Sequence, residues 1–205
     1  MDEKKKRKGR RAFLNDFKVG GDGQYSYMGA VHRYNGKLPY NKVLARFAAL
    51  GGALLLALVG IGVIPAPGMT GYNNFYVVPL FVFELIAAFI TEWAVVRFLV
   101  NGRKGELRAY AFEATVKRLP VLGSITAVIA ALSVPANIVY LAINGFEGKP
   151  AASIAVMLLH CAAAASAFLI RKCTEATEWI VSAVKQEETV KDEEIFPPYE
   201  PEKRD

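Results

Sequence analysis

Val121–Ile143 has the sequence VLGSITAVIAALSVPANIVYLAI, which is 23 residues without a charged side chain. About 20 apolar residues in a helix cross the ~30 Å hydrocarbon core of a bilayer, whereas a helix of a soluble domain needs one polar face. Three further stretches have the same character: Phe47–Ile64, Phe75–Val100 and Ala151–Ile170. The sequence therefore predicts an all-α integral membrane protein built as a four-helix transmembrane bundle.

The polar residues gather at the two ends of the 205-residue chain, although 53% of all residues are hydrophobic and the mean hydropathy is +0.25. Residues 1–46 are expected to form a cytoplasmic basic arm and a small hairpin, and residues 47–170 the membrane domain. Residues 171–205 are expected to form a juxtamembrane amphipathic helix and an acidic, disordered tail. Because the first 40 residues lack a continuous apolar core, we expect no secretory signal peptide.

The placement of Lys and Arg predicts the orientation of the four spans. Four spans put both termini and the middle connection on one side of the membrane. Of the 25 Lys and Arg residues, only Lys149 falls in the two connections on the other side. By the positive-inside rule, both termini lie in the cytoplasm, and we expect a multi-pass protein of the plasma membrane.

Two charged runs flank the membrane domain. Residues 1–11 carry seven bases and two acids, while residues 185–205 carry four bases and eight acids. Bases close to a membrane surface attract anionic lipid, by about 1 kcal/mol each. The alternative is that the basic run only fixes topology. The candidate head-group contacts are Lys4, Lys5, Lys6, Arg7, Lys8, Arg10 and Arg11.

Short elements are expected on the cytoplasmic side. The Tyr-rich segment from Gln24 to Tyr34 is followed by Asn35-Gly36, a strong signal for a hairpin turn. We expect a strand ending at Tyr34 and a second one near Leu38–Tyr40. The pattern over residues 105–118 predicts a helix on the membrane interface, and residues 174–185 can extend the fourth span as an amphipathic helix.

Three polar side chains within the spans are expected to form one cluster. Glu84, Asn137 and His160 lie roughly 9–14 Å below the outer ends of the second, third and fourth spans, counted at 1.5 Å per residue. Each is on a helix face that carries small or polar residues at helical spacing. An ionisable group in a membrane needs a partner or a task, so we expect these side chains to meet inside the bundle.

The cluster has several interpretations. It can be a hydrogen-bonded network that fixes which helices pack together. It can instead be a functional Glu–His pair that relays protons or binds an ion, since histidine titrates near neutral pH. A third possibility is that the three side chains do not meet.

A second acid, Glu92, lies about 12 Å further inward on the same span. It is expected either to pair with Arg97 near the cytoplasmic edge or, with Glu84, to line a crevice across the membrane. The second arrangement is typical of a transporter.

The sequence offers little support for catalysis or for a metal. We find no Ser-His-Asp set, HExxH motif or glycine-rich phosphate loop, and one His with one Glu is too small a ligand set. Cys161 and Cys173 form no CxxC pair. We therefore expect no enzyme, catalytic residue, cofactor or metal.

Two functions remain open. The first is a non-enzymatic accessory or assembly partner of a membrane complex, with the cytoplasmic arm, hairpin and tail as contact surfaces. The alternative is a small transporter or proton-coupled carrier that uses Glu84 and His160. The expected partners are the lipid bilayer and either another protein or a second copy of the chain. Nucleic acid is not expected, because no aromatic-rich nucleic-acid-binding fold accompanies the basic run.

Overall fold

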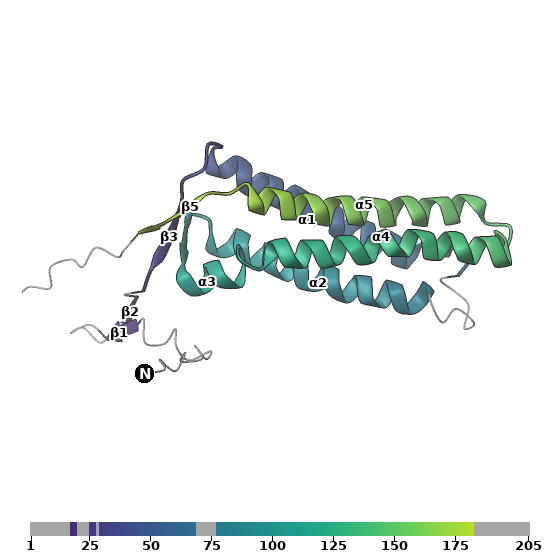
Figure 1. Cartoon of the computed structure of the whole chain (residues 1–205), viewed down its shortest axis with the longest axis horizontal. Helices are drawn as coiled ribbons and strands as arrows, with labels where there is room; N and C mark the ends of the chain where they lie inside the picture. The colour runs from purple at the N-terminus through teal and green to yellow at the C-terminus, as the bar shows by residue number, and fades with distance from the viewer. Residues whose placement is uncertain (1–16, 20–24, 28, 69–76, 183–205) are drawn as a thin grey trace, which may run out of the picture.

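The computed structural model describes residues 17–19, 25–27, 29–68 and 77–182. The candidate head-group contacts between Lys4 and Arg11 and the acidic tail lie outside these residues. Four long helices run side by side, and a small sheet lies across one end of the bundle (Figure 1).

The four helices are α1 (Tyr40–Val63), α2 (Val77–Asn101), α4 (Leu119–Asn144) and α5 (Pro150–Glu175). Helix α5 packs on α4 and α1, and α2 packs on α4 and α1, so the helices form a closed ring. All four are long and apolar enough to cross a membrane. This finding supports the predicted bundle, with helix ends that differ from the predicted spans by at most seven residues.

The outer faces of the helices are apolar. Large side chains such as Leu56, Phe89 and Ile143 are about 70% exposed in the bundle. Water would make such a surface costly, at about 25 cal/mol for each Å² of apolar area left uncovered. A hydrocarbon solvent removes this cost, so the exposed surface agrees with the length and composition of the helices.

The small residues Ala49, Ala53, Ala57 and Gly60 recur at helical spacing on α1, a pattern that predicts a close-packing face. Only part of this face is turned inward: Ala57 is buried and Gly60 lies against Leu159 of α5, whereas Ala49 and Ala53 are exposed and Phe47 and Leu54 are buried instead. The reason is that α1 is apolar on every side, so the shape of its neighbours sets its rotation. Phe47 packs on Phe98 of α2, with ring centroids 4.8 Å apart.

The sheet joins three segments that are far apart in the sequence. Its order is β4 (Glu106–Arg108), β3 (Val31–Tyr34) and β5 (Trp179–Ser182), all antiparallel. Thus the segment before α1, the segment between α2 and α4, and the segment after α5 lie at the same end of the bundle. Between any two of these segments, the chain must therefore run along the bundle an even number of times.

The face of the sheet that is turned to the helices is aromatic. Trp179 contacts Tyr34, Tyr40, Phe98 and Phe112 at centroid distances from 5.7 to 6.3 Å. His32 stacks on Phe112 at 3.8 Å. Burial of this ring, together with the nearby charge of Lys117, lowers the pKa of His32. The sheet therefore closes the end of the bundle with a layer of aromatic side chains.

The predicted hairpin around Asn35-Gly36 is wrong. A strand does end at Tyr34, but α1 begins at Tyr40 and leaves no second strand at residues 38–40. Both edges of β3 are already occupied by β4 and β5. A different two-stranded pairing, β1 (Phe17–Val19) with β2 (Tyr25–Tyr27), precedes the sheet.

Two predicted helices at this end also need correction. Residues 105–118 form β4 and a short helix α3 (Ala109–Ala114), because Leu107 is buried beneath the sheet while its backbone pairs with β3. The chain after α5 forms β5 instead of continuing as a helix, since α5 ends at Glu175 and Trp179 joins the aromatic layer.

Candidate functional site

Glu84 lies in the centre of the bundle. It is on α2, on the same face as Ala88 and Thr91, and all three are completely buried. The small side chains of Ala88 and Thr91 allow α4 to approach α2 closely. The carboxyl group therefore faces α4 and α5 and is removed from the outer surface of the bundle.

One oxygen of Glu84 joins three helices. The Oγ of Ser133 on α4 donates a hydrogen bond to Oε2 of Glu84 at 2.7 Å, and Nδ1 of His160 on α5 lies 2.8 Å from the same oxygen. His160 is 1% exposed, so the whole contact is shielded from the surroundings. The predicted meeting of Glu84 with His160 is present in this geometry.

Among the residues that the structure describes, two polar atoms of the pair find no hydrogen-bond partner. They are Oε1 of Glu84 and Nε2 of His160, and both are buried. The ring of Phe81 presents its edge toward the imidazole, with the centroids 6.4 Å apart. A buried unpaired polar atom costs about 1–3 kcal/mol, so these two atoms are the energetically least satisfied part of the cluster.

Asn137 does not contact Glu84 or His160 in the part of the chain that the structure describes. Its Nδ2 donates to the backbone oxygen of Ser133 at 2.8 Å, one turn away on α4. Asn137 is thus connected to the cluster only through Ser133. Ser133 itself fits the depth of Glu84 better, because it lies ten residues before Ile143 while Asn137 lies six before it.

A second polar contact joins α2 and α4 deeper in the bundle. The hydroxyl groups of Thr91 and Thr126 are 2.9 Å apart, and both residues are completely buried. Thr91 also donates to the backbone oxygen of Ala87. The facing sides of α2 and α4 therefore carry two polar contacts. Only the contact at Glu84, which is farther from the sheet, includes an ionisable pair.

Glu92 has a different neighbour from the one predicted. Its carboxyl group lies over Gly51 of α1, where a Cβ would come within 3.0 Å of Oε2, and its Oε1 is buried without a partner. Arg97 is exposed and makes no ion pair with Glu92 among the described residues. Glu84 faces α4 and α5 while Glu92 faces α1, so the two carboxyl groups lie at different helix interfaces.

The interface between α1 and α2 beside Glu92 is open at the outer surface of the bundle. A groove of about 820 Å³ runs between α1 and α2, and Glu92 is the one acid in its otherwise apolar lining. Its walls include Leu55, Phe89 and Trp93. In a membrane, lipid chains would fill such a groove.

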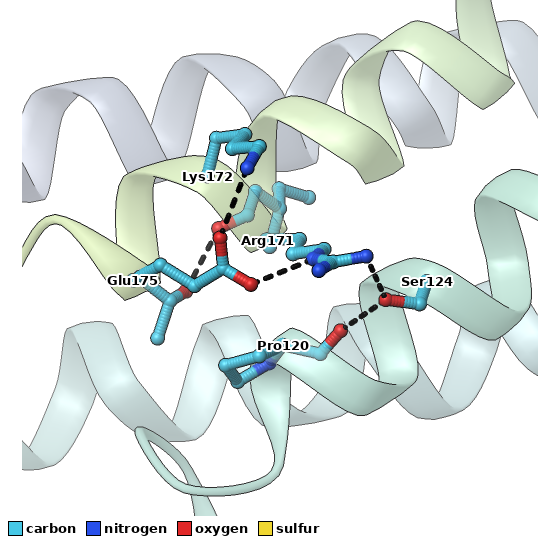
Figure 2. Close-up of polar contacts among 7 residues, drawn as sticks. Pro120, Ser124, Arg171, Lys172 and Glu175 are labelled. Atoms are coloured by element: carbon cyan, nitrogen blue, oxygen red, sulfur yellow. Dashed lines mark hydrogen bonds and ion pairs between the residues drawn. The ribbon is translucent and has the colours of Figure 1, made fainter.

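Another polar network lies where α4 and α5 cross at the sheet end (Figure 2). Arg171 donates from Nη1 to Oγ of Ser124 at 3.1 Å and from Nε to Oε1 of Glu175 at 2.7 Å, and Ser124 in turn donates to the backbone oxygen of Pro120. Gly123 permits the close approach, because its Cα faces the backbone oxygen of Ala167. In the sequence, Arg171 is only one of the bases that predict the orientation of the spans.

The arrangement around Glu84 differs from a hydrolase site. In a serine nucleophile site the histidine lies between the serine and the acid. Here Ser133 and His160 both hydrogen-bond to Oε2 of Glu84, so the acid lies between the other two groups. Within the described ranges, no three His, Cys, Asp or Glu side chains are placed to hold a metal ion.

The chain matches no family model, and it matches no curated protein and no solved structure.

Proposed function

We propose that this chain is a non-enzymatic accessory or assembly partner of a membrane complex, with both termini in the cytoplasm and four spans in the plasma membrane. The length and apolar surface of the helices support membrane insertion. The distribution of Lys and Arg supports the orientation. The sheet collects three segments at one end of the bundle, and a compact surface at this end supports the proposal of a partner contact there.

The observation that carries this proposal is the edge strand β5. Ile180 and Val181 are 53% and 60% exposed, although they lie beyond the end of α5 and outside the spans. An edge strand with exposed apolar side chains is a template for pairing with another chain. Soluble surfaces usually blunt such an edge with charge or proline, so a partner is the simplest reason for its persistence.

The first prediction concerns Ile180→Lys. A charge at the centre of the contact is expected to reduce partner recovery about tenfold, which corresponds to ~1.4 kcal/mol of binding free energy. Recovery is measured by quantitative mass spectrometry after photo-crosslinking in native membranes. Phe146→Lys places the same charge on an exposed apolar residue in the α4–α5 connection, at the opposite end of the bundle. Equal recovery from the wild type and the Ile180 variant would exclude β5 as the contact.

A second candidate is a proton-coupled carrier, and it is favoured by the unpartnered atoms of Glu84 and His160. An imidazole and a carboxyl group in contact are chemically suited to passing a proton from one to the other. Both groups are completely buried, so a carrier would have to open the seam between α2, α4 and α5 during each cycle.

The second prediction tests this candidate with Glu84→Gln, which keeps the size of the side chain and removes its titration. A carrier would dissipate a pH gradient across vesicles, followed with a trapped pH dye, and the variant would lose that flux. Ser133→Ala serves as a control that alters the cluster while leaving the Glu–His pair. If wild-type vesicles are no leakier than protein-free vesicles, the carrier is excluded and the accessory function stands.

A further inference from the structure

A pocket of about 380 Å³ lies beside the sheet, where α1 begins and α5 ends. The connection from β3 to α1, the first turns of α1 and the last turn of α5 form its walls. The pocket is separate from the Glu84 cluster, which lies in the outer half of the predicted membrane domain.

The walls of the pocket combine positive charge with an apolar floor. Lys37, Arg46 and Lys172 line it, against one acid, Glu178. Lys172 shares its charge with Glu175, whose Oε2 lies 3.3 Å from Nζ (Figure 2). Lys37 and Arg46 are exposed, and neither forms an ion pair with any described residue. Two cations are therefore available to an anion.

The first turn of α1 adds to the positive potential. The helix is 24 residues long, its N-cap is Pro39, and no side chain caps the free N–H groups. No acid lies in its first turn. The N-terminal end of a helix carries a partial positive charge, so this end favours an anion near Lys37 and Arg46.

The position of the pocket fits a lipid head group. Arg46 directly precedes the first apolar stretch, and Lys172 follows the end of the fourth at Ile170. Below Arg46, the same side of α1 exposes the small residues Ala49 and Ala53. A head group held at the pocket could thus extend its acyl chains along a smooth strip of α1.

We infer that this pocket binds the phosphate of an anionic phospholipid of the cytoplasmic leaflet. Arg46 offers a planar pair of N–H donors to the phosphate oxygens, and Lys37 provides a second charge. Leu38, which is 41% exposed, faces the glycerol end of the lipid, above a floor formed by the buried Val43 and Phe47. Basic pockets at the cytoplasmic ends of membrane helices are suited to this role.

The third prediction uses the double variant Lys37→Gln/Arg46→Gln in the full chain. The measurement is the exchange of fluorescent phosphatidylglycerol into nanodiscs of phosphatidylcholine that contain the protein. Loss of two charges near the surface is expected to weaken binding of the anionic lipid about 30-fold. Both side chains are exposed, so the bundle should fold normally, which circular dichroism checks.

The matched control is Lys42→Gln/Arg118→Gln, which removes the same charge from exposed residues at the same end outside the pocket. An equal loss in this control would show a general surface potential and overturn the inference. A photoreactive phosphatidylglycerol should label the α1 and α5 residues of the pocket. Labelling elsewhere, or competition by inorganic phosphate as effective as that of the lipid, would also overturn it.

Discussion

Replacing Glu84 with alanine is expected to lower the free energy of unfolding of the bundle by about 2–4 kcal/mol. The substitution leaves the Oγ of Ser133 and Nδ1 of His160 without the oxygen that both contact, and it opens a cavity between three helices. The measurement is a denaturant titration in detergent micelles, followed by circular dichroism. This is the first of the two largest effects that the geometry predicts.

The control for this substitution is Leu85→Ala. Leu85 is the next residue on α2 and is 45% exposed on the outer face, so its loss should change the unfolding free energy by less than about 0.5 kcal/mol. The double variant with His160→Ala should cost less than the sum of its two single variants, because the Glu84–His160 contact is then counted only once. If Glu84→Ala costs no more than Leu85→Ala, the cluster does not hold the helices together.

Two substitutions at Glu84 distinguish a role of its carboxyl group in helix packing from a role in proton transfer. Glu84→Gln keeps an oxygen that can accept from Ser133 and His160, so it should retain most of the stability that alanine removes. A stability loss in the alanine variant, with no flux in the wild type, would assign the contact to helix packing. Measuring both quantities on the same variants therefore distinguishes a structural network from a proton pathway.

The four long apolar helices could be predicted because their signal is local. Each span is a continuous apolar stretch, and on α2, α4 and α5 the polar residues Glu84, Ser133 and His160 mark the inward face by helical spacing alone. The first span carries no such polar marker. Its small residues Ala49, Ala53, Ala57 and Gly60 predict one packing face, but only the last two lie against neighbours, and the bulky Phe47 fills the space beside α2.

The sheet could not be predicted because its pairing is not local. Arg33 on β3 bonds Glu106 on β4, which is 73 residues away, and Tyr34 pairs with Trp179 on β5. Strands of three or four residues carry almost no periodic pattern of their own. The Asn35-Gly36 signal favoured a local partner for β3, but the two distant strands bury Leu107 and cover Trp179.

The close crossing of α4 and α5 leads to the last prediction. A Cβ on Gly123 would lie 2.7 Å from the backbone oxygen of Ala167 and 3.3 Å from Cβ of Arg171. Gly123→Ala must therefore push the two helices apart, at a cost of about 1–3 kcal/mol in unfolding free energy. The shift would also lengthen the hydrogen bond from Arg171 to Ser124 that crosses this seam (Figure 2).

Gly52→Ala is the matched control, because it makes the same change within a helix where no atom lies within 4 Å of the added Cβ. Alanine there should leave stability unchanged or raise it by about 0.5–1 kcal/mol, since glycine is the poorer helix former. Both variants are measured by the same titration in detergent. A Gly123 variant as stable as the Gly52 variant would mean that α4 and α5 do not approach at this point, and the packing of α5 on α4 would have to be reconsidered.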